Sequence, residues 1–331
     1  MKLRVGIAGL GKIGERHLNA YSGIKNVEVT GYCDSNDALS KKYSKLIKAT
    51  SFNDINSLVE SDEIDAIDVC LPTSEHHEVI LKALHNKKHV FCEKPLTHKL
   101  EYAEEIKRKS EGVGKTIMVG YLYRFHPSFE LLNDVLSKEV IGKPYYAIFR
   151  IGGRGGHKAW KHQLEEGGGA TFDMLTHMLD LALYFFGEPI KSTLLFSDII
   201  LKERLIDGEK VQVNAEDCIL VHIETGNGVQ ALLQADLITP SFMNIVEVHG
   251  ENGSFFGSII SRFPTIVYCK EPRDVYDRGE NVFNFPPTNL IEKELRYFID
   301  CISNSGCPES SIEDSIKGLR VIEQIRRQQN E

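Results

Sequence analysis

The first third of the chain alternates short runs of apolar and β-branched residues with longer amphipathic stretches, and this rhythm strongly constrains the fold. It predicts strands at residues 3–8, 27–33, 66–71, 88–92 and 116–119, with helical patterns between them. Strands that alternate with helices of about ten residues imply right-handed βαβ crossovers and a mainly parallel sheet. We therefore expect an α/β domain with a doubly wound parallel sheet over residues 1–122.

The pattern changes after about residue 123. A strand is predicted at 144–151 and a helix at 170–186, and a β-rich region follows from 190 to 269. The clearest hairpin joins 211–224 to 229–237 through Gly226-Asn227-Gly228. Two further helices are predicted at 290–302 and 312–328. Because strands followed by strands form antiparallel sheets, residues 123–331 are predicted to be a second, α+β domain.

Composition excludes several classes of protein. The 331 residues carry a formal net charge of −8, which disfavours a nucleic-acid partner. No run of apolar residues approaches the roughly 18 needed for a spanning helix, so no membrane partner is predicted. The seven cysteines are odd in number and lack a C-x-x-C spacing, which favours a reducing compartment. We expect a cytoplasmic protein.

The first predicted strand ends in a G-x-G-x-x-G motif that opens a helix, Gly9-Leu10-Gly11-Lys12-Ile13-Gly14. The glycines allow a tight turn, a close approach of the backbone to a diphosphate, and close packing of helix on strand. The helix N-terminus adds N–H donors and a positive dipole end. The motif therefore predicts a dinucleotide site formed by Gly9, Gly11, Lys12, Ile13 and Gly14.

Asp34 ends the second predicted strand, about twenty residues after the motif. A carboxylate here accepts hydrogen bonds from the adenosine ribose and repels a 2′-phosphate, so NAD is predicted over NADP. A turn acid that caps the following helix is the alternative. Lys41 and Lys42 keep NADP open as a second cofactor.

A lysine follows the strand predicted at 88–92, within Glu93-Lys94-Pro95. The carboxyl ends of strands in an open α/β sheet line the ligand crevice, so Lys94 is expected near a bound nicotinamide. There its ammonium stabilises an alkoxide as hydride leaves carbon. The alternative is an ordinary surface lysine at a turn.

A second polar group lies on the helix that follows Gly167-Gly168-Gly169. Asp173, His177 and Asp180 share one face at helical spacing, and His177 has the pKa range that suits proton transfer near neutral pH. A buried structural His–Asp pair is an open alternative. A zinc site is another, but a catalytic zinc needs three protein ligands and none other is indicated here, so no metal is predicted.

Together these motifs resemble the Gfo/Idh/MocA oxidoreductases, which include glucose–fructose oxidoreductase and inositol dehydrogenase. Leu71-Pro72-Thr73 with His76 resembles that family's Thr-Pro-Asn-x-x-His segment, and Gly120–Pro127 resembles its Gly-Phe-Asn-x-Arg-Phe-x-Pro. Leu122 and Leu175 depart from the family pattern, where asparagine and glycine are common.

The resemblance implies the roles of the site residues. It implies a catalytic group of Lys94, Asp173 and His177, with His177 as general acid/base, and cofactor contacts from Leu71, Thr73, His76, Glu93 and Lys94. It also implies a Rossmann domain, a C-terminal domain with a large open and mostly antiparallel sheet, and a homodimer or homotetramer formed through that sheet. Sugars, cyclitols and nucleotide sugars are the implied substrates.

A glycine-rich, basic segment at 152–162 is the candidate substrate loop, with His157 and Trp160 as donors and an aromatic face. Tyr121 and Arg124 complete the predicted substrate contacts, together with Asp173 and His177. The sequence thus predicts an NAD(P)-dependent dehydrogenase or reductase that acts on CH–OH groups of a polyhydroxylated substrate. A non-catalytic dinucleotide-binding regulator and a metal-dependent hydrolase are the alternatives.

Overall fold

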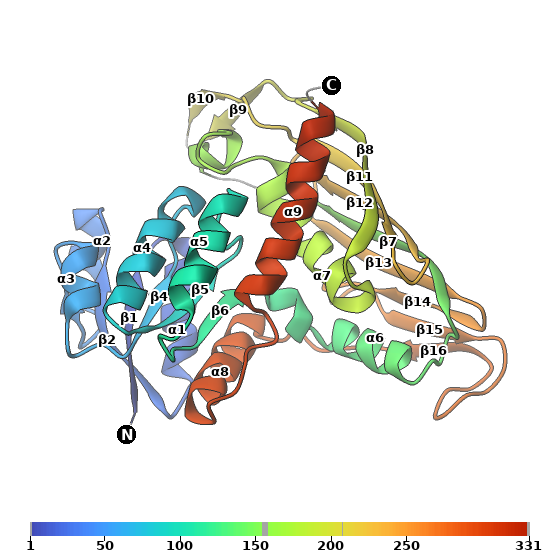
Figure 1. The fold of residues 1–331 in the computed structure, drawn as a ribbon, viewed down its shortest axis with the longest axis horizontal. Coiled ribbons are helices and arrows are strands. Elements are labelled where there is room, and N and C mark those ends of the chain that lie inside the picture. Colours follow the sequence, from blue (N-terminus) through green and yellow to red (C-terminus); the bar gives the residue numbers. More distant parts are fainter. Residues whose placement is uncertain (1, 154–157, 207, 330–331) are drawn as a thin grey trace. The chain divides into compact units, whose positions relative to one another are not determined.

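The computed structural model describes residues 2–153, 158–206 and 208–329 (Figure 1). Contacts between Cα atoms divide the chain into two compact units. The first unit contains Met1–Leu122 and Asn289–Ile316, and the second contains Tyr123–Thr288 and Lys317–Glu331. The division expected from the sequence was a single cut after residue 122. The contacts instead group residues 289–316 with the N-terminal unit.

The sheet of the first unit is parallel throughout its described pairings, in the order β3-β2-β1-β4-β5-β6. Its strands are β1 (Leu3–Ala8), β2 (Val27–Cys33), β3 (Thr50–Ser51), β4 (Ala66–Val69), β5 (His89–Glu93) and β6 (Ile117–Gly120). The predicted doubly wound sheet is confirmed. The sequence did not predict β3, because its two exposed residues give no apolar run.

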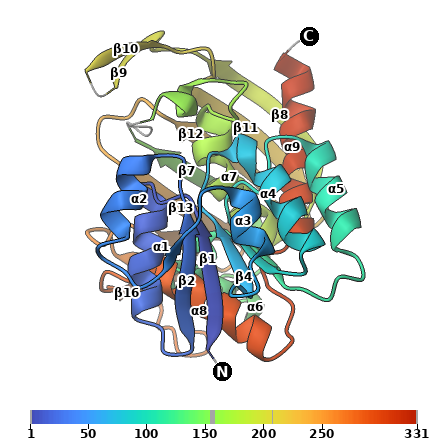
Figure 2. The same cartoon turned by 90° about the vertical axis from the view of Figure 1, so that its left-hand side faces the viewer.

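Helices cover both faces of this sheet (Figures 1 and 2). They are α1 (Lys12–Ser22), α2 (Asp37–Tyr43), α3 (Ile55–Glu60), α4 (Thr73–His85), α5 (Leu100–Ser110) and α8 (Leu290–Ser303). Strand β4 is buried along its whole length, as its apolar residues on both parities require. Helix α8, which lies almost 200 residues after β5 in the sequence, packs against α1 and contacts β5.

The second unit contains a sheet in the order β16-β15-β14-β13-β7-β12-β11-β8. Its strands are β7 (Pro144–Gly152), β8 (Pro189–Asp198), β11 (Cys218–Thr225), β12 (Gln230–Asp236), β13 (Met243–Gly250), β14 (Gly253–Gly257), β15 (Thr265–Cys269) and β16 (Gly279–Phe283). All its described pairings are antiparallel except that of β12 with β7. The expectation of a mostly antiparallel sheet is confirmed.

The predicted hairpin needs one correction. Strands β11 and β12 pair as expected, but Val211 and Gln212 belong to β10 (Glu209–Gln212), which pairs with β9 (Glu203–Ile206) in a separate ribbon. Asp217 explains the break between β10 and β11, because its buried carboxylate accepts the N–H groups of Ile200 and Leu201 at 2.8 Å. A continuous strand would leave those groups without this partner.

Helices of the second unit lie against one face of its sheet (Figure 1). They are α6 (Pro127–Ser137), the π-helical turn η3 (Thr171–Leu175), α7 (Thr176–Phe186) and the second-unit part of α9 (Ile312–Gln329). The helix predicted at 170–186 therefore begins as a π-helical turn. Two short 3₁₀ segments, η1 (Leu122–Phe125) and η2 (Ala159–His162), flank β7 in the sequence. Within the described ranges, no helix has both the length and the apolar character required to span a membrane.

Candidate active site

The glycine motif lies in the turn from β1 to α1, where each glycine has a different environment. Gly9 has a φ of +93°, and a Cβ there would lie 2.6 Å from the carbonyl oxygen of Cys70. A Cβ on Gly14 would collide with the carbonyl oxygen of Gly9, whereas one on Gly11 would meet no atom within 4 Å. Gly11 is the N-cap of α1 and offers no side-chain cap. The backbone is therefore open at Gly11, and the first N–H groups of α1 suit a diphosphate.

Asp34 lies directly after β2, beside this turn. Its carboxylate accepts the N–H of Leu10 at 2.6 Å and the N–H of Asn36 at 2.7 Å. Since an ionised carboxylate has about four acceptor positions, two stay available for ribose hydroxyl groups. The chain thus offers the three groups that an NAD site of this kind requires: an open glycine turn, a helix N-terminus and an acid.

The turns that follow β4 and β5 are tied together by His76. Its Nδ1 lies 2.9 Å from the carbonyl oxygen of Pro95, and its Nε2 lies 2.9 Å from that of Leu71. The ring is buried, and this burial lowers the pKa of His76. The structure thus places His76 beneath the two turns, where it fixes their spacing. Its predicted contact with the cofactor stays a prediction, as do those of Leu71 and of the buried Thr73.

Lys94 follows β5 at the same edge of the sheet and is half-buried. It precedes Pro95 through a cis peptide bond. The preceding Glu93 is buried, and its carboxylate faces inward, with Oε1 3.0 Å from Nε2 of His17. The two neighbouring residues therefore differ in setting. Lys94 is half-buried at the carboxyl edge of the sheet, whereas the carboxylate of Glu93 is held in the core of the first unit.

In the second unit, Asp173, His177 and Asp180 occupy successive turns of η3 and α7, and each meets a side chain from elsewhere in the chain. Asp173 Oδ1 accepts the ammonium of Lys161 at 2.5 Å. His177 is buried and stacks on the ring of Tyr123, with centroids 4.4 Å apart. These contacts hold the carboxylate and the imidazole in defined positions.

Asp180 forms a buried, two-pronged ion pair with Arg124. The guanidinium donates from Nε at 2.9 Å and from a terminal nitrogen at 2.5 Å, and both side chains are less than 5% exposed. The same guanidinium lies over the ring of Tyr184 at 4.7 Å. Arg124 is thus part of the core of the second unit, and its predicted contact with substrate stays untested.

The glycine triplet before η3 packs against η2 and the loop before β11. A Cβ on Gly168 would lie 2.6 Å from the carbonyl oxygens of both Trp160 and Lys161, and one on Gly169 would lie 2.7 Å from the carboxylate of Glu216. That carboxylate accepts the N–H of Thr171 at 3.0 Å. An acid at the first turn is the favourable charge for a helix N-terminus. The glycines therefore allow the helix that carries Asp173 and His177 to begin close to Lys161 and Glu216.

The other predicted substrate residues lie in different settings. Tyr121 is buried in the first unit, and its hydroxyl oxygen lies 3.1 Å from that of Ser315. Trp160 is half-buried in η2. His157 lies outside the described residues.

Sequence reasoning did not assign Lys161, Tyr123 or Glu216 to the site. The basic segment that contains Lys161 was recognised, but nothing in its spacing links it to Asp173. Tyr123 lies within the segment Gly120–Pro127 without a signal of its own, and the isolated Glu216 gives none either. All three act through contacts between segments far apart in the sequence.

Comparison with known proteins decides the family. The chain matches two family models, "Oxidoreductase family, NAD-binding Rossmann fold" over residues 3–121 and "Oxidoreductase family, C-terminal alpha/beta domain" over residues 134–331. The chain belongs to the Gfo/Idh/MocA oxidoreductase family. The predicted family, the Rossmann domain and the NAD cofactor are thereby confirmed.

Several characterised relatives of this Gfo/Idh/MocA protein are similar over most of its length. It is 27% identical over 319 residues to myo-inositol 2-dehydrogenase of Thermotoga maritima, which covers 96% of this chain and 93% of the relative. It is 26% identical over 326 residues to scyllo-inositol 2-dehydrogenase (NAD(+)) of Bacillus subtilis, covering 97% and 92%. It is 29% identical over 282 residues to D-glucoside 3-dehydrogenase of Escherichia coli, covering 80% and 78%.

Solved structures share the fold. A levoglucosan dehydrogenase in complex with NADH and levoglucosan matches with a TM-score of 0.90 and 20% identity, covering 99% of this chain and 97% of the other. The Gfo/Idh/MocA protein described here is thus an NAD-dependent oxidoreductase with the fold of its family.

Proposed function

We propose that this protein transfers a hydride between nicotinamide and a hydroxyl-bearing or keto carbon of a sugar, a cyclitol or a nucleotide sugar. Relatives that act on such compounds support the proposal, among them myo-inositol 2-dehydrogenase and D-glucoside 3-dehydrogenase. A relative named dTDP-3,4-didehydro-2,6-dideoxy-alpha-D-glucose 3-reductase, 25% identical, extends the range to nucleotide sugars.

The observation that carries the proposal is the position of Lys94. It follows β5 at the carboxyl edge of an NAD-binding parallel sheet, the edge at which the glycine turn also lies. In open α/β sheets this edge is where ligands bind. A half-buried ammonium at this edge is suited to hold a substrate oxygen as charge develops on it.

Each catalytic residue has a proposed task. Lys94 stabilises the substrate oxygen as its proton leaves, and His177 accepts or returns that proton. Asp173, held by Lys161, orients the imidazole or a substrate hydroxyl. Nicotinamide, when bound, supplies the acceptor or donor of hydride, and the chain's own contribution is positioning and charge.

The proposal also gives roles to the predicted substrate- and cofactor-binding residues. Tyr121, Arg124, His157 and Trp160 contact or support the substrate, and Arg124 does so indirectly, because it is buried on Asp180. Asp34 favours NAD through the ribose, while NADP stays open as a weaker cofactor. The two lysines of α2, Lys41 and Lys42, are the residues that would tolerate a 2′-phosphate.

The outer face of the second sheet suits association of copies of this chain as a homodimer or homotetramer. Burial alternates along β7, β11, β12 and β13, and the less buried positions include Ile148, Leu220, Leu232 and Ile245. Half-buried apolar side chains that lie among polar ones on one sheet face are typical of an interface between copies. Seven cysteines without disulfide bonds are consistent with a proposed cytoplasmic location.

A nicotinamide absorbance screen tests the function. The purified protein is mixed with NAD⁺ or NADP⁺ and a panel of cyclitols, sugars, sugar acids and nucleotide sugars, and with NADH and the corresponding keto compounds. We expect turnover with NAD(H) on at least one polyhydroxylated compound. NADH binding without turnover across the whole panel would overturn the proposal and favour a non-catalytic binding protein.

A further inference from the structure

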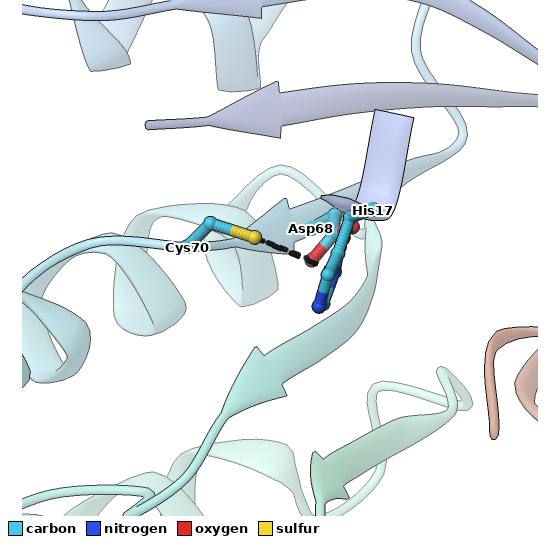
Figure 3. Close-up of side chains that lie close together, drawn as sticks. All are labelled: His17, Asp68 and Cys70. Carbon is cyan, nitrogen blue, oxygen red and sulfur yellow. Dashed lines mark hydrogen bonds and ion pairs between the residues drawn. The ribbon is translucent and has the colours of Figure 1, made fainter. Parts of the chain in front are cut away.

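A cluster of buried polar side chains lies where α1 and α8 meet strands β4 and β5 in the first unit. It comprises His17 of α1, Asp68 of β4, Cys70, Glu93 of β5 and Glu294 of α8, of which three are drawn in Figure 3. His17, Asp68 and Glu294 are fully buried, and Cys70 and Glu93 are less than a tenth exposed. Burying so many ionisable groups is costly unless they pair with one another.

His17 is the centre of the cluster. Its Nδ1 lies 2.9 Å from Oδ2 of Asp68, and its Nε2 lies 3.0 Å from Oε1 of Glu93. The Cys70 thiol lies 3.4 Å from both His17 Nδ1 and Asp68 Oδ1 (Figure 3). Both ring nitrogens thus face carboxylates, so the ring is bridged between β4 and β5.

The charge states follow from this geometry. Burial lowers the pKa of His17, but Asp68 opposes it so strongly that the pKa ends well above its usual value. Burial raises the pKa of Glu93, but the hydrogen bond and charge of His17 bring it below its usual value, and Lys94 adds to this effect. These directions and the geometry describe an imidazolium held between the carboxylates of Asp68 and Glu93.

Glu294 is in the opposite state. Burial, and then the charge of Glu93, raise the pKa of Glu294 well above its usual value, and neither of its oxygens has a hydrogen-bond partner. The environment of Glu294 thus favours its protonated, uncharged form, in contrast to that of Glu93. The other titratable groups that act on the cluster are Arg16, Tyr21, His76, Cys92 and Lys94.

We propose that His17 is a positioning residue for Lys94: by holding the carboxylate of Glu93 inside the unit, it fixes the turn from which the next residue, Lys94, reaches the substrate. The inference rests on the proposed role of Lys94. Misplacing a reactive group by about 1 Å can cost about 100-fold in rate, so a distant anchor of this kind has a measurable effect on turnover.

The same atoms are close enough to be considered as a metal site. Ligand atoms of His17, Glu93 and Glu294 all lie within 4.8 Å of one another. The positioning role predicts that no cation is bound, because both ring nitrogens of His17 are already engaged by the carboxylates of Asp68 and Glu93 and offer no lone pair to a metal. Dialysis against EDTA is therefore expected to leave the melting temperature unchanged, and a fall reversed by Zn²⁺ or Mn²⁺ would overturn the proposal.

The main test replaces His17 with Gln, which keeps a donor but loses the charge. The matched control is His89→Gln, since His89 is a partly buried histidine at the other end of β5. With the best substrate found in the absorbance screen, we expect His17→Gln to lower kcat about 10- to 100-fold while the Kd for NADH changes less than about 3-fold. The control is expected to keep the kcat of the wild type.

A readout at Lys94 itself separates positioning from general damage. Without His17 the carboxylate of Glu93 loses the partner that holds it inside the unit, so the turn that carries Lys94 is no longer anchored and the half-buried ammonium becomes more accessible to reagents. Acetylation of Lys94 by acetic anhydride near pH 8, followed by mass spectrometry, is expected to be several-fold faster in His17→Gln than in the wild type or in His89→Gln. Equal labelling rates in all three proteins would overturn the proposal.

A double-mutant cycle with Glu93→Gln completes the test. If His17 acts through Glu93, its replacement has no further effect on kcat in the Glu93→Gln background, whereas independent effects multiply and refute the inference. Should His17→Gln fail to fold, Glu93→Asp withdraws the carboxylate from His17 and keeps the charge. The same loss of kcat is expected, and an unchanged kcat refutes the inference.

Lys94→Ala distinguishes a failure here from a failure of the proposed function. If Lys94→Ala leaves turnover unchanged, the role of Lys94 is wrong. If Lys94→Ala stops turnover and His17→Gln does not reduce it, only the positioning role of His17 is wrong.

Discussion

The edge of the parallel sheet and the helix that begins at Thr171 carry the two halves of the proposed chemistry, and they hold their side chains in different ways. At the sheet edge, the glycine turn, Asp34 and Lys94 follow directly from the ends of β1, β2 and β5. On η3 and α7, Asp173, His177 and Asp180 depend on Lys161, Tyr123 and Arg124. In the first region the backbone brings the side chains to the strand ends, and His76 and His17 anchor the turns themselves, whereas in the second region each side chain is held directly by a contact with a distant segment.

This difference predicts how each region responds to mutation. A side chain placed by the backbone can be removed with loss of function and little loss of stability. A side chain placed by a buried ion pair leaves a charged partner behind when it is lost, so stability falls as well. The first four predictions below test this contrast, and the fifth tests the buried cluster around His17.

Lys94→Ala is expected to have the largest effect. It removes the group that stabilises the substrate oxygen, so kcat is expected to fall about 10²- to 10⁴-fold, while the Kd for NADH and the melting temperature change little. Steady-state kinetics, NADH fluorescence titration and thermal melts measure these quantities. Lys99→Ala, an exposed lysine five residues on, is the matched control. A large drop in melting temperature for Lys94→Ala would show that this side chain also stabilises the fold, so that the two regions do not differ in this respect.

Arg124→Ala is expected to show the opposite pattern. It removes the cation that pairs with the buried carboxylate of Asp180, so the free energy of unfolding is expected to fall by about 3–5 kcal/mol. Urea unfolding measures this loss. A variant that keeps its stability but has a raised KM would instead support a direct contact between Arg124 and substrate.

Lys161→Ala tests whether the ion pair with Asp173 contributes to the reaction. The partly buried carboxylate loses its cation, so we expect kcat to fall about 10-fold, equivalent to about 1.4 kcal/mol in the barrier. Lys161→Arg is expected to recover most of this loss. The neighbouring, exposed Lys158→Ala serves as the control. Equal kinetics for Lys161→Ala and Lys158→Ala would show that the ion pair does not serve the reaction.

Asp34→Ser tests cofactor choice at the sheet edge. Removing the carboxylate removes ribose hydrogen bonds and the repulsion of a 2′-phosphate, so the preference for NAD over NADP is expected to narrow about 10-fold, or about 1.4 kcal/mol. The ratio of the two Kd values measures it. Asp37→Ser, in the first turn of α2, is the control. An unchanged ratio would assign Asp34 to the turn alone, through Leu10 and Asn36.

Glu294→Gln is expected to have the smallest effect, and it depends on pH. The raised pKa of Glu294 means that its contribution to stability is fully present below the unfolded pKa of about 4.3 and is lost as pH rises through the folded pKa. Glutamine has no such loss. The melting temperature of Glu294→Gln relative to the wild type is therefore expected to rise between about pH 5 and pH 8. A constant difference would show that Glu294 is ionised in the folded protein.

Much of the first unit could be predicted because its signals are local. The bounds predicted for β1 and β2 agree with the structure, since each strand is a short run rich in apolar and β-branched residues that ends at a turn. Residues 289–316 are the exception. The amphipathic pattern of α8 shows that it packs against something, but it does not show that its partner is α1 rather than an element of the second unit.

The residues of the candidate site also fall into those that local sequence patterns indicate and those that only the structure reveals. Strand ends and helical periodicity are readable in a sequence, so they made Lys94, Asp173 and His177 candidates, and the family resemblance implied their catalytic roles. Lys161 and Glu216 could not be assigned to the site from the sequence. Each contacts the helix only because η2 and the loop before β11 pack beside it, and the sequence does not show that packing.

The sequence by itself determined the order of elements, the dinucleotide motif and the chemical types of the reactive side chains. These depend on residues that are neighbours along the chain or one helical turn apart. Only the tertiary structure decided which charges neutralise one another: His17 with Glu93, Lys161 with Asp173 and Arg124 with Asp180. Ion pairing depends on distance and burial in space, and neither is encoded in the spacing of residues along the chain.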